Sequence, residues 1–221
     1  MNAAGARASA DGARQRLASG IVALGLKVSD SAQDSMLRYL DELRAWNRAY
    51  NLTAVRDPAE MVTRHVLDAL AILPWLETGS RLLDVGSGAG LPAVPLALAA
   101  PRLAVTALDS NGKKARFLRH VQRTLPLANL EVIEARVQDY RPAQAFPAVV
   151  SRAFAELGDF LRQTAPLVAE DGRWLAMKGK VSSAELESLP PGMRIEAIHP
   201  LHVPGLRAAR SLVIVRREPR P

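Results

Sequence analysis

The chain has 221 residues, 48% of them hydrophobic and 23% charged, which is enough for one α/β domain with an extension. It contains no cysteine, which excludes a disulfide framework and a thiolate metal site, and no apolar run reaches the roughly 18 residues that a membrane-spanning helix needs. The net charge of +7 indicates a polyanionic partner, although the small share of lysine among the 29 basic residues also fits a bias in genomic base composition.

The first third of the chain has a helical pattern. Residues 1–12 carry small side chains with little apolar content, and we predict a flexible tail there. Through residues 13–78 apolar side chains recur at three- and four-residue spacing, and Asp57 is a predicted N-cap before Pro58 at a first helical position. We therefore expect about three helices in residues 13–78, forming an extension that packs on a core domain of residues 79–217.

A glycine-rich loop follows the first predicted strand. Residues 81–86 form a short apolar run, after which glycine stands at alternate positions, Gly86, Gly88 and Gly90. Glycine tolerates positive φ and lets an adenosine-sized group lie against the backbone, so the loop indicates a ligand site. The dinucleotide fingerprint G-x-G-x-x-G requires glycine at position 91, where this chain has Leu91, which disfavours a nicotinamide cofactor.

An acidic residue ends the second predicted strand. This run, residues 103–109, stops at Asp109, which is 19 residues after Gly90. A carboxylate at the tip of the neighbouring strand can accept two ribose hydroxyls, so the loop and the acid together predict an adenosine clamp. The alternative is an ordinary strand-helix turn in which Asp109 caps the next helix.

The rest of the chain alternates apolar runs with helical stretches, as in a parallel sheet covered on both faces. Further strands are predicted at residues 130–135, 146–152, 173–178, 194–198 and 211–215. Because no long helix separates the last two, they should form an antiparallel pair at one edge. Seven such strands match the α/β, Rossmann-like sheet of class I S-adenosylmethionine-dependent methyltransferases, here with an N-terminal helical extension.

Several stretches between residues 46 and 180 carry a more specific resemblance. They are residues 46–57, 64–68, 86–92, 108–110, 113 with 116–118, 136–137, 151–154 and 177–179. In this order they resemble the ribosomal small-subunit RNA methyltransferase G family, also called glucose-inhibited division protein B. Members of that family transfer a methyl group from S-adenosylmethionine to guanine N7 in 16S rRNA. The chain ends, residues 1–30 and the segment after 190, match weakly.

The resemblance implies S-adenosylmethionine as cofactor and a set of residues that contact it: Gly86, Leu91, Val137, Gln138 and Arg152. The family often has an acid where this chain has Gln138, which affects only the role of that side chain. On physical grounds we add Gly88 in the loop, Asp109 for the ribose, and Asp84 at the end of the first strand. Asp84 has two open interpretations: it orients the methionine part or the loop, or its carboxylate is satisfied by loop amides.

The reaction that the resemblance implies asks for no general base, because guanine N7 attacks the sulfonium methyl in line without first losing a proton. No carboxylate pair, Ser/His/Asp set or metal-ligand cluster stands out, and we predict no metal. Arg136, Arg152 and Lys178 follow predicted strands and should point into the cleft as positioning groups. The residues predicted to contact RNA are Arg64, His65, Lys113, Arg116, Arg136 and Lys178. Each has an ordinary alternative, a solvated helix surface or a packed core histidine.

The partner implied is 16S rRNA or a small-subunit assembly particle, bound by a monomer in the cytoplasm, since neither a secretory signal nor a membrane span is visible. A methyltransferase acting on another RNA, on a small molecule or on a protein remains an alternative. A nicotinamide-dependent oxidoreductase is disfavoured by Leu91.

Overall fold

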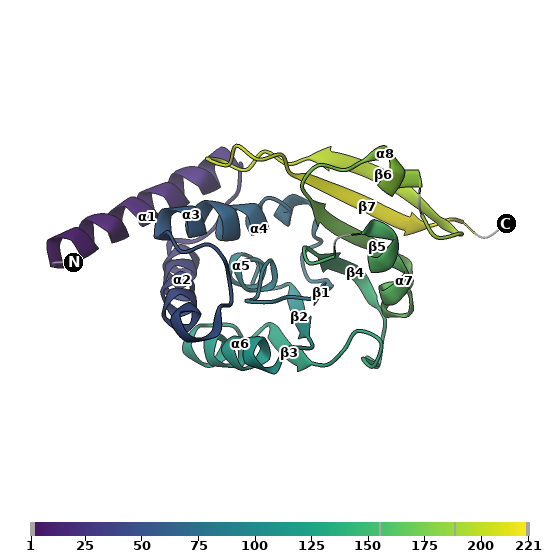
Figure 1. The fold of residues 1–221 in the computed structure, drawn as a ribbon, viewed down its shortest axis with the longest axis horizontal. Helices are drawn as coiled ribbons and strands as arrows, with labels where there is room; N and C mark the ends of the chain where they lie inside the picture. Colours follow the sequence, from purple (N-terminus) through teal and green to yellow (C-terminus); the bar gives the residue numbers. More distant parts are fainter. Residues whose placement is uncertain (1–2, 155, 188, 220–221) are drawn as a thin grey trace.

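A seven-stranded sheet runs through the molecule in the order β3-β2-β1-β4-β5-β7-β6 (Figure 1). The computed structural model describes residues 3–154, 156–187 and 189–219. The strands are β1 (Arg81–Val85), β2 (Ala104–Asp109), β3 (Leu130–Glu134), β4 (Phe146–Ser151), β5 (Val168–Lys178), β6 (Met193–Pro200) and β7 (Ser211–Arg217). The first five are parallel, and β7 pairs antiparallel with both β5 and β6. The predicted strands and the antiparallel edge pair are confirmed.

Helices precede the sheet and cover it. Before β1 the chain forms α1 (Ala3–Ala23), α2 (Asp30–Tyr50), α3 (Pro58–Met61), the π-helix η1 (Val62–Leu67), α4 (Asp68–Leu70) and the short 3₁₀ helix η2 (Leu73–Trp75). Between strands lie α5 (Ala93–Ala99), α6 (Gly112–Thr124), α7 (Leu157–Thr164), the 3₁₀ helix η3 (Ala165–Leu167) and α8 (Ser183–Glu187).

The N-terminal helices follow from local signals. Helix α2 begins after Ser29, whose hydroxyl accepts the amide of Ala32, and ends at Asn51 in the left-handed conformation. The predicted cap at Asp57 is confirmed, because its carboxylate accepts the amide of Glu60 at 2.9 Å. Instead of one regular helix after this cap, the backbone changes from α to π geometry at Val62.

The expected flexible tail, residues 1–12, lies partly outside the described residues. From residue 3 onward the backbone belongs to α1, which projects away from the body of the molecule (Figure 1). Flexibility of this segment stays a prediction, as does a domain boundary near residue 79.

Side chains alternate between the two faces of the sheet, so each face has its own core. On β1, Leu82 joins the cluster formed with α1, α2, α5 and α6, whereas Leu83 joins the cluster that includes α7. On β5, Leu175 and Trp174 divide in the same way, and both are fully buried. The strand order reverses between β1 and β4, and open α/β sheets bind ligands at the carboxyl ends of strands on either side of such a reversal.

Candidate functional site

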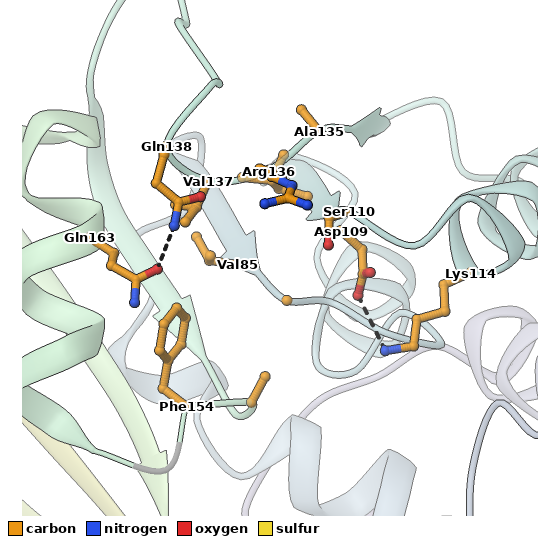
Figure 2. A pocket seen from close by; sticks show the side chains of 13 residues that line it. Val85, Asp109, Ser110, Lys114, Ala135, Arg136, Val137, Gln138, Phe154 and Gln163 are labelled. Atoms are coloured by element: carbon orange, nitrogen blue, oxygen red, sulfur yellow. Dashed lines mark hydrogen bonds and ion pairs between the residues drawn. The ribbon is translucent and has the colours of Figure 1, made fainter.

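A pocket of about 430 Å³ opens at the carboxyl ends of the parallel strands, within the size range of small-molecule sites (Figure 2). The residues lining it come from the ends of β1, β2, β3 and β4, from α6 and from α7: Val85, Gly86, Leu108, Asp109, Ser110, Lys114, Ala135, Arg136, Val137, Gln138, Ala153, Phe154 and Gln163. In Figure 2, Asp109 and Lys114 lie on one side and Gln138, Gln163 and Phe154 on the other, with Arg136 between them.

The glycine loop brings bare backbone to this pocket. Gly86 has φ +72°, and a Cβ placed on it would lie 2.9 Å from the Cβ of Ala153 across the pocket wall. Gly90 has φ +92° and packs so closely on α5 that an added Cβ would meet Val94 at 2.5 Å. Both positions therefore require glycine, one for the pocket and one for packing of the loop on the helix.

The helical extension holds the loop from below. The hydroxyl of Tyr39, a fully buried residue of α2, donates a 2.8 Å hydrogen bond to the carbonyl oxygen of Ala89. Burial raises the pKa of this hydroxyl well above its ordinary value, so Tyr39 stays a neutral donor. Helix α2 therefore contributes directly to the shape of the glycine loop.

Asp109 joins the loop to the end of β2. One carboxylate oxygen accepts the amide of Gly88 at 2.8 Å, and the other accepts the amide of Asn111 at 2.8 Å. The Lys114 ammonium lies 3.6 Å from the carboxylate, which is only 7% exposed. Each carboxylate oxygen can accept more than one hydrogen bond, so both retain the capacity to bind a hydroxyl in the pocket.

Asp84 is buried at the end of β1 beneath the loop. One oxygen accepts the amide of Ala93 at the start of α5, at 3.1 Å, and the other has no hydrogen-bond partner among the described residues. The buried hydroxyl of Ser87 in the loop is likewise without a partner there. The loop-amide interpretation of Asp84 therefore accounts for one oxygen only, and the polar capacity left over fits a bound ligand with polar groups.

Burial raises the pKa of Asp84 from 3.8 to about 7, with smaller opposing effects from the amide of Ala93 and the charge of Arg152. The folded state therefore holds the proton more tightly than the unfolded chain, and ionisation costs stability as the pH rises from about 4 to about 7. We expect the free energy of unfolding of the wild type to fall relative to Asp84→Asn over this window, and then to run parallel to it. Urea titrations of both proteins at each pH measure this difference, and a constant difference would contradict the burial effect.

Some of the residues predicted to contact the cofactor line the pocket, and others lie behind its wall. Gly86, Asp109, Val137 and Gln138 line the pocket, and the side chain of Gln138 donates to Gln163 at 3.2 Å. Gly88 is held through its amide by Asp109, Asp84 lies beneath the loop, and Leu91 is 7% exposed in the core. Arg152 is not among the described residues that line the pocket.

Arg152 instead points toward the helical extension. Its guanidinium donates to a carboxylate oxygen of Asp68 at 3.0 Å and to the carbonyl of Arg64 at 3.2 Å. The second oxygen of Asp68 accepts from Arg210 at 3.0 Å. Asp68 is 1% exposed, so one buried carboxylate joins α4, the segment after β4 and the segment before β7.

Arg136, Arg152 and Lys178, which are expected to point into the cleft as positioning groups, differ in their surroundings; that role stays a prediction for all three. Arg136 is exposed and lines the pocket. Lys178 forms an ion pair with Glu185 at 2.5 Å and donates to the carbonyl of Phe154 at 3.2 Å. Asp68, 84 residues away in sequence, thus holds Arg152, whereas Lys178 is held by Glu185, which follows shortly after it in the chain.

The predicted RNA contacts are also divided. Arg64, Lys113, Arg116 and Arg136 are exposed, as an RNA contact requires. His65 is 3% exposed and forms a 2.9 Å hydrogen bond with the hydroxyl of Thr53, and burial lowers its pKa to about 4. This burial agrees with the packed-histidine alternative, and contact of His65 with RNA stays a prediction. The charge of Lys178 is compensated by Glu185, which argues against its role as an RNA contact.

Sequence reasoning missed several residues of the site. Tyr39 holds the glycine loop through a hydrogen bond, and Asp68 holds Arg152. Phe154 and Gln163 line the pocket. The signal for Asp68 was an acid on the otherwise apolar face of its helical segment, where a buried charge requires a partner. Gln163 carries no signal, since its position depends on how α7 packs.

Within residues 3–154, 156–187 and 189–219, none of the helices combines the length and the apolar character that a membrane span requires. No group of three or more His, Asp or Glu side chains in the same part of the chain is arranged to hold a metal ion.

Comparisons with known proteins agree with this geometry. The family model described as rRNA small subunit methyltransferase G matches residues 32–213. A ribosomal RNA small subunit methyltransferase G of Pseudomonas aeruginosa (strain LESB58) is 52% identical over 201 residues, covering 91% of this chain and 94% of that protein.

Solved structures share the fold. A predicted O-methyltransferase of Agrobacterium tumefaciens superposes with a TM-score of 0.56 at 25% identity, covering 70% of this chain and 81% of that one. Coclaurine N-methyltransferase bound to N-methylheliamine and SAH gives a TM-score of 0.56 at 16% identity, covering 86% of this chain and 71% of that one. The chain is a methyltransferase that uses S-adenosylmethionine, and it belongs to the rRNA small subunit methyltransferase G family.

Proposed function

We propose that this protein methylates N7 of a guanosine in 16S rRNA. The observation that carries the proposal is the charge of the pocket. Among the described residues that line it, Asp109 is the one carboxylate, and two backbone amides and Lys114 already engage it. A site without an available base suits a nucleophile that has no proton to lose, and the N7 lone pair of guanine is such a nucleophile.

S-adenosylmethionine, when bound, supplies an electrophilic methyl group on its sulfonium. Asp109 would accept the ribose hydroxyls, Gly86 would leave room for the ligand beside the loop, and the segment at Val137 and Gln138 would hold the adenine. The methyl group would be transferred in line: the N7–carbon bond would form as the carbon–sulfur bond breaks, and the electron pair would go to sulfur.

The chain's own groups would act by position and charge. Arg136 lines the pocket and can hold a phosphate or the O6 edge of guanine, which keeps N7 in a near-attack geometry. Positive charge moves from sulfur to the purine during the reaction, so this arginine has to act through geometry and not through proton transfer.

Two observations support 16S rRNA as the substrate. The relatives carry the name of a small-subunit rRNA methyltransferase, and the net charge of +7 favours a polyanion. The protein would then act in the cytoplasm, as a monomer, on protein-free rRNA or on a small-subunit assembly particle.

The test compares 16S rRNA from cells that have or lack the gene for this chain, with N7-methylguanosine mapped by chain cleavage at the modified base. We expect one modified position to disappear and to return with the wild-type gene. Gly86→Asp should not restore it, because φ +72° and the 2.9 Å approach to Ala153 leave no room for a side chain. An unchanged modification map would overturn the 16S rRNA assignment and favour another RNA, a small molecule or a protein as methyl acceptor.

A further inference from the structure

A second pocket, of about 440 Å³, lies between the helical extension and the segment before β7. Arg16 of α1, Thr63 and Arg64 of η1, and the turn at Gly205 and Arg207 all contribute to its lining. Figure 1 shows the chain between β6 and β7 reaching across to the helices of the extension. We refer to this pocket as the arginine groove.

Three guanidinium groups from three distant segments meet in this groove. Arg16, Arg64 and Arg207 are all exposed. Arg64 lies 3.6 Å from Glu60, whereas Arg16 and Arg207 form no ion pair with any described residue. The second acid of the groove, Asp57, accepts a hydrogen bond from the amide of Glu60 as a helix cap, which does not neutralise the carboxylate. Three guanidinium groups therefore face two carboxylates, and the net charge of the groove is positive.

The wall of the groove also contains a polar group without a partner. Thr63 is 4% exposed, and its hydroxyl makes no hydrogen bond to the described residues. Gly205, at φ +79°, passes directly over it: an added Cβ would lie 3.5 Å from this hydroxyl oxygen. A buried donor without an acceptor costs free energy, which is consistent with a position that serves a ligand.

The groove connects to the cofactor pocket through Arg152. The carbonyl of Arg64 accepts from Arg152, and Asp68 binds both Arg152 and Arg210. The two residues after Arg152 are Ala153 and Phe154, which line the cofactor pocket. The groove and the pocket are thus adjacent, on opposite sides of one arginine.

We propose that the arginine groove binds backbone phosphate of the RNA substrate, next to the nucleotide that enters the cofactor pocket. This inference rests on the proposed function, because it takes RNA to be the substrate. Guanidinium groups bind phosphate in bidentate fashion, and contacts of this kind fix the register of a nucleic acid on a protein. Arg16 lies outside the residues that the family model matches, 32–213, whereas Arg207 lies within them.

The test measures binding of 16S rRNA to the full-length protein as a function of salt, with S-adenosylhomocysteine present so that no reaction occurs. In Arg16→Gln/Arg207→Gln, loss of two phosphate contacts should flatten the plot of log affinity against log salt by about 1.4, and weaken binding about tenfold at low salt. Arg102→Gln is the matched control: Arg102 is exposed, it precedes β2 at the amino ends of the parallel strands, and the slope of this variant should stay that of the wild type.

An unchanged slope in the double variant, or an equal loss in the control, would overturn the groove assignment. Loss of binding to assembled subunits without loss of binding to protein-free rRNA would also overturn it, in favour of a contact with a ribosomal protein. Methylation of the same rRNA by the wild type is measured in parallel. If the wild type neither binds nor methylates rRNA, the proposed function itself fails, which separates the two outcomes.

Discussion

Replacement of Asp68 by alanine is expected to lower the free energy of unfolding by about 3 kcal/mol. Asp68 is 1% exposed and forms ion pairs at 3.0 Å with both Arg152 and Arg210. Removing the carboxylate leaves two guanidinium groups without their partner at the junction of three segments. The expected loss is at the lower end for a broken buried pair, because the arginine side chains are 29% and 23% exposed and can regain some hydration.

Urea unfolding monitored by circular dichroism measures this loss as a midpoint lowered by more than about 1 M. Asp68→Asn keeps one acceptor oxygen and should lose less. The matched control is Asp159→Ala, which breaks an exposed ion pair with Arg162 on α7 and should cost less than about 1 kcal/mol. Equal stabilities of Asp68→Ala and Asp159→Ala would show that the buried network contributes no more than a surface pair.

The parts of the fold that were predictable are those that local sequence encodes. The apolar runs in the sequence predicted the bounds of β1 and β2 to within a residue or two. A central strand that is buried on both faces consists of an almost uninterrupted run of apolar residues. Strand β5 begins at Val168, five residues earlier than the predicted start at 173. Its first part contains exposed Glu170 and Asp171, which hid the strand pattern.

The position of the glycine loop was predictable for a related reason. The glycine spacing follows from the positive φ angles and the close approach that a ligand-binding loop requires of its backbone. This pattern and Asp109 can therefore be recognised in the sequence without knowledge of distant contacts. The distance between Asp109 and the amide of Gly88, 2.8 Å across 21 residues of sequence, agrees with the expectation that acid and loop act together.

The directions of the charged side chains were not predictable. Arg152 lies at the carboxyl edge of the sheet as expected, but its partner Asp68 is 84 residues away in sequence, and Arg210 is 142 residues from the same carboxylate. Which carboxylate a given arginine meets depends on how the extension docks on the sheet. The change to π-helical geometry in η1, which carries Arg64 into the arginine groove, is likewise absent from the apolar periodicity.

Replacement of Asp109 by alanine is expected to weaken binding of S-adenosylhomocysteine about 100-fold, which corresponds to roughly 3 kcal/mol. The carboxylate would lose its hydrogen bonds to the ribose, and the amides of Gly88 and Asn111 would lose the group that holds the loop at the end of β2. Both effects weaken binding of S-adenosylhomocysteine. For S-adenosylmethionine a third effect is added, because Lys114, 3.6 Å from the carboxylate in the wild type, would leave an uncompensated positive charge in the pocket that receives the sulfonium.

Isothermal titration calorimetry measures the dissociation constant directly, and Asp109→Asn serves as a second variant that keeps the shape of the side chain and one acceptor. Its affinity should fall between those of the wild type and the alanine variant. Glu134→Ala is the matched control, since Glu134 ends the neighbouring strand β3 and pairs with Arg119 without lining the pocket. Wild-type affinity in Asp109→Ala would mean that the ribose binds elsewhere. A loss of affinity of equal size in Glu134→Ala would attribute the effect to the strand ends in general. A loss confined to Asp109→Ala assigns recognition of the cofactor to the carboxylate that joins the glycine loop to β2.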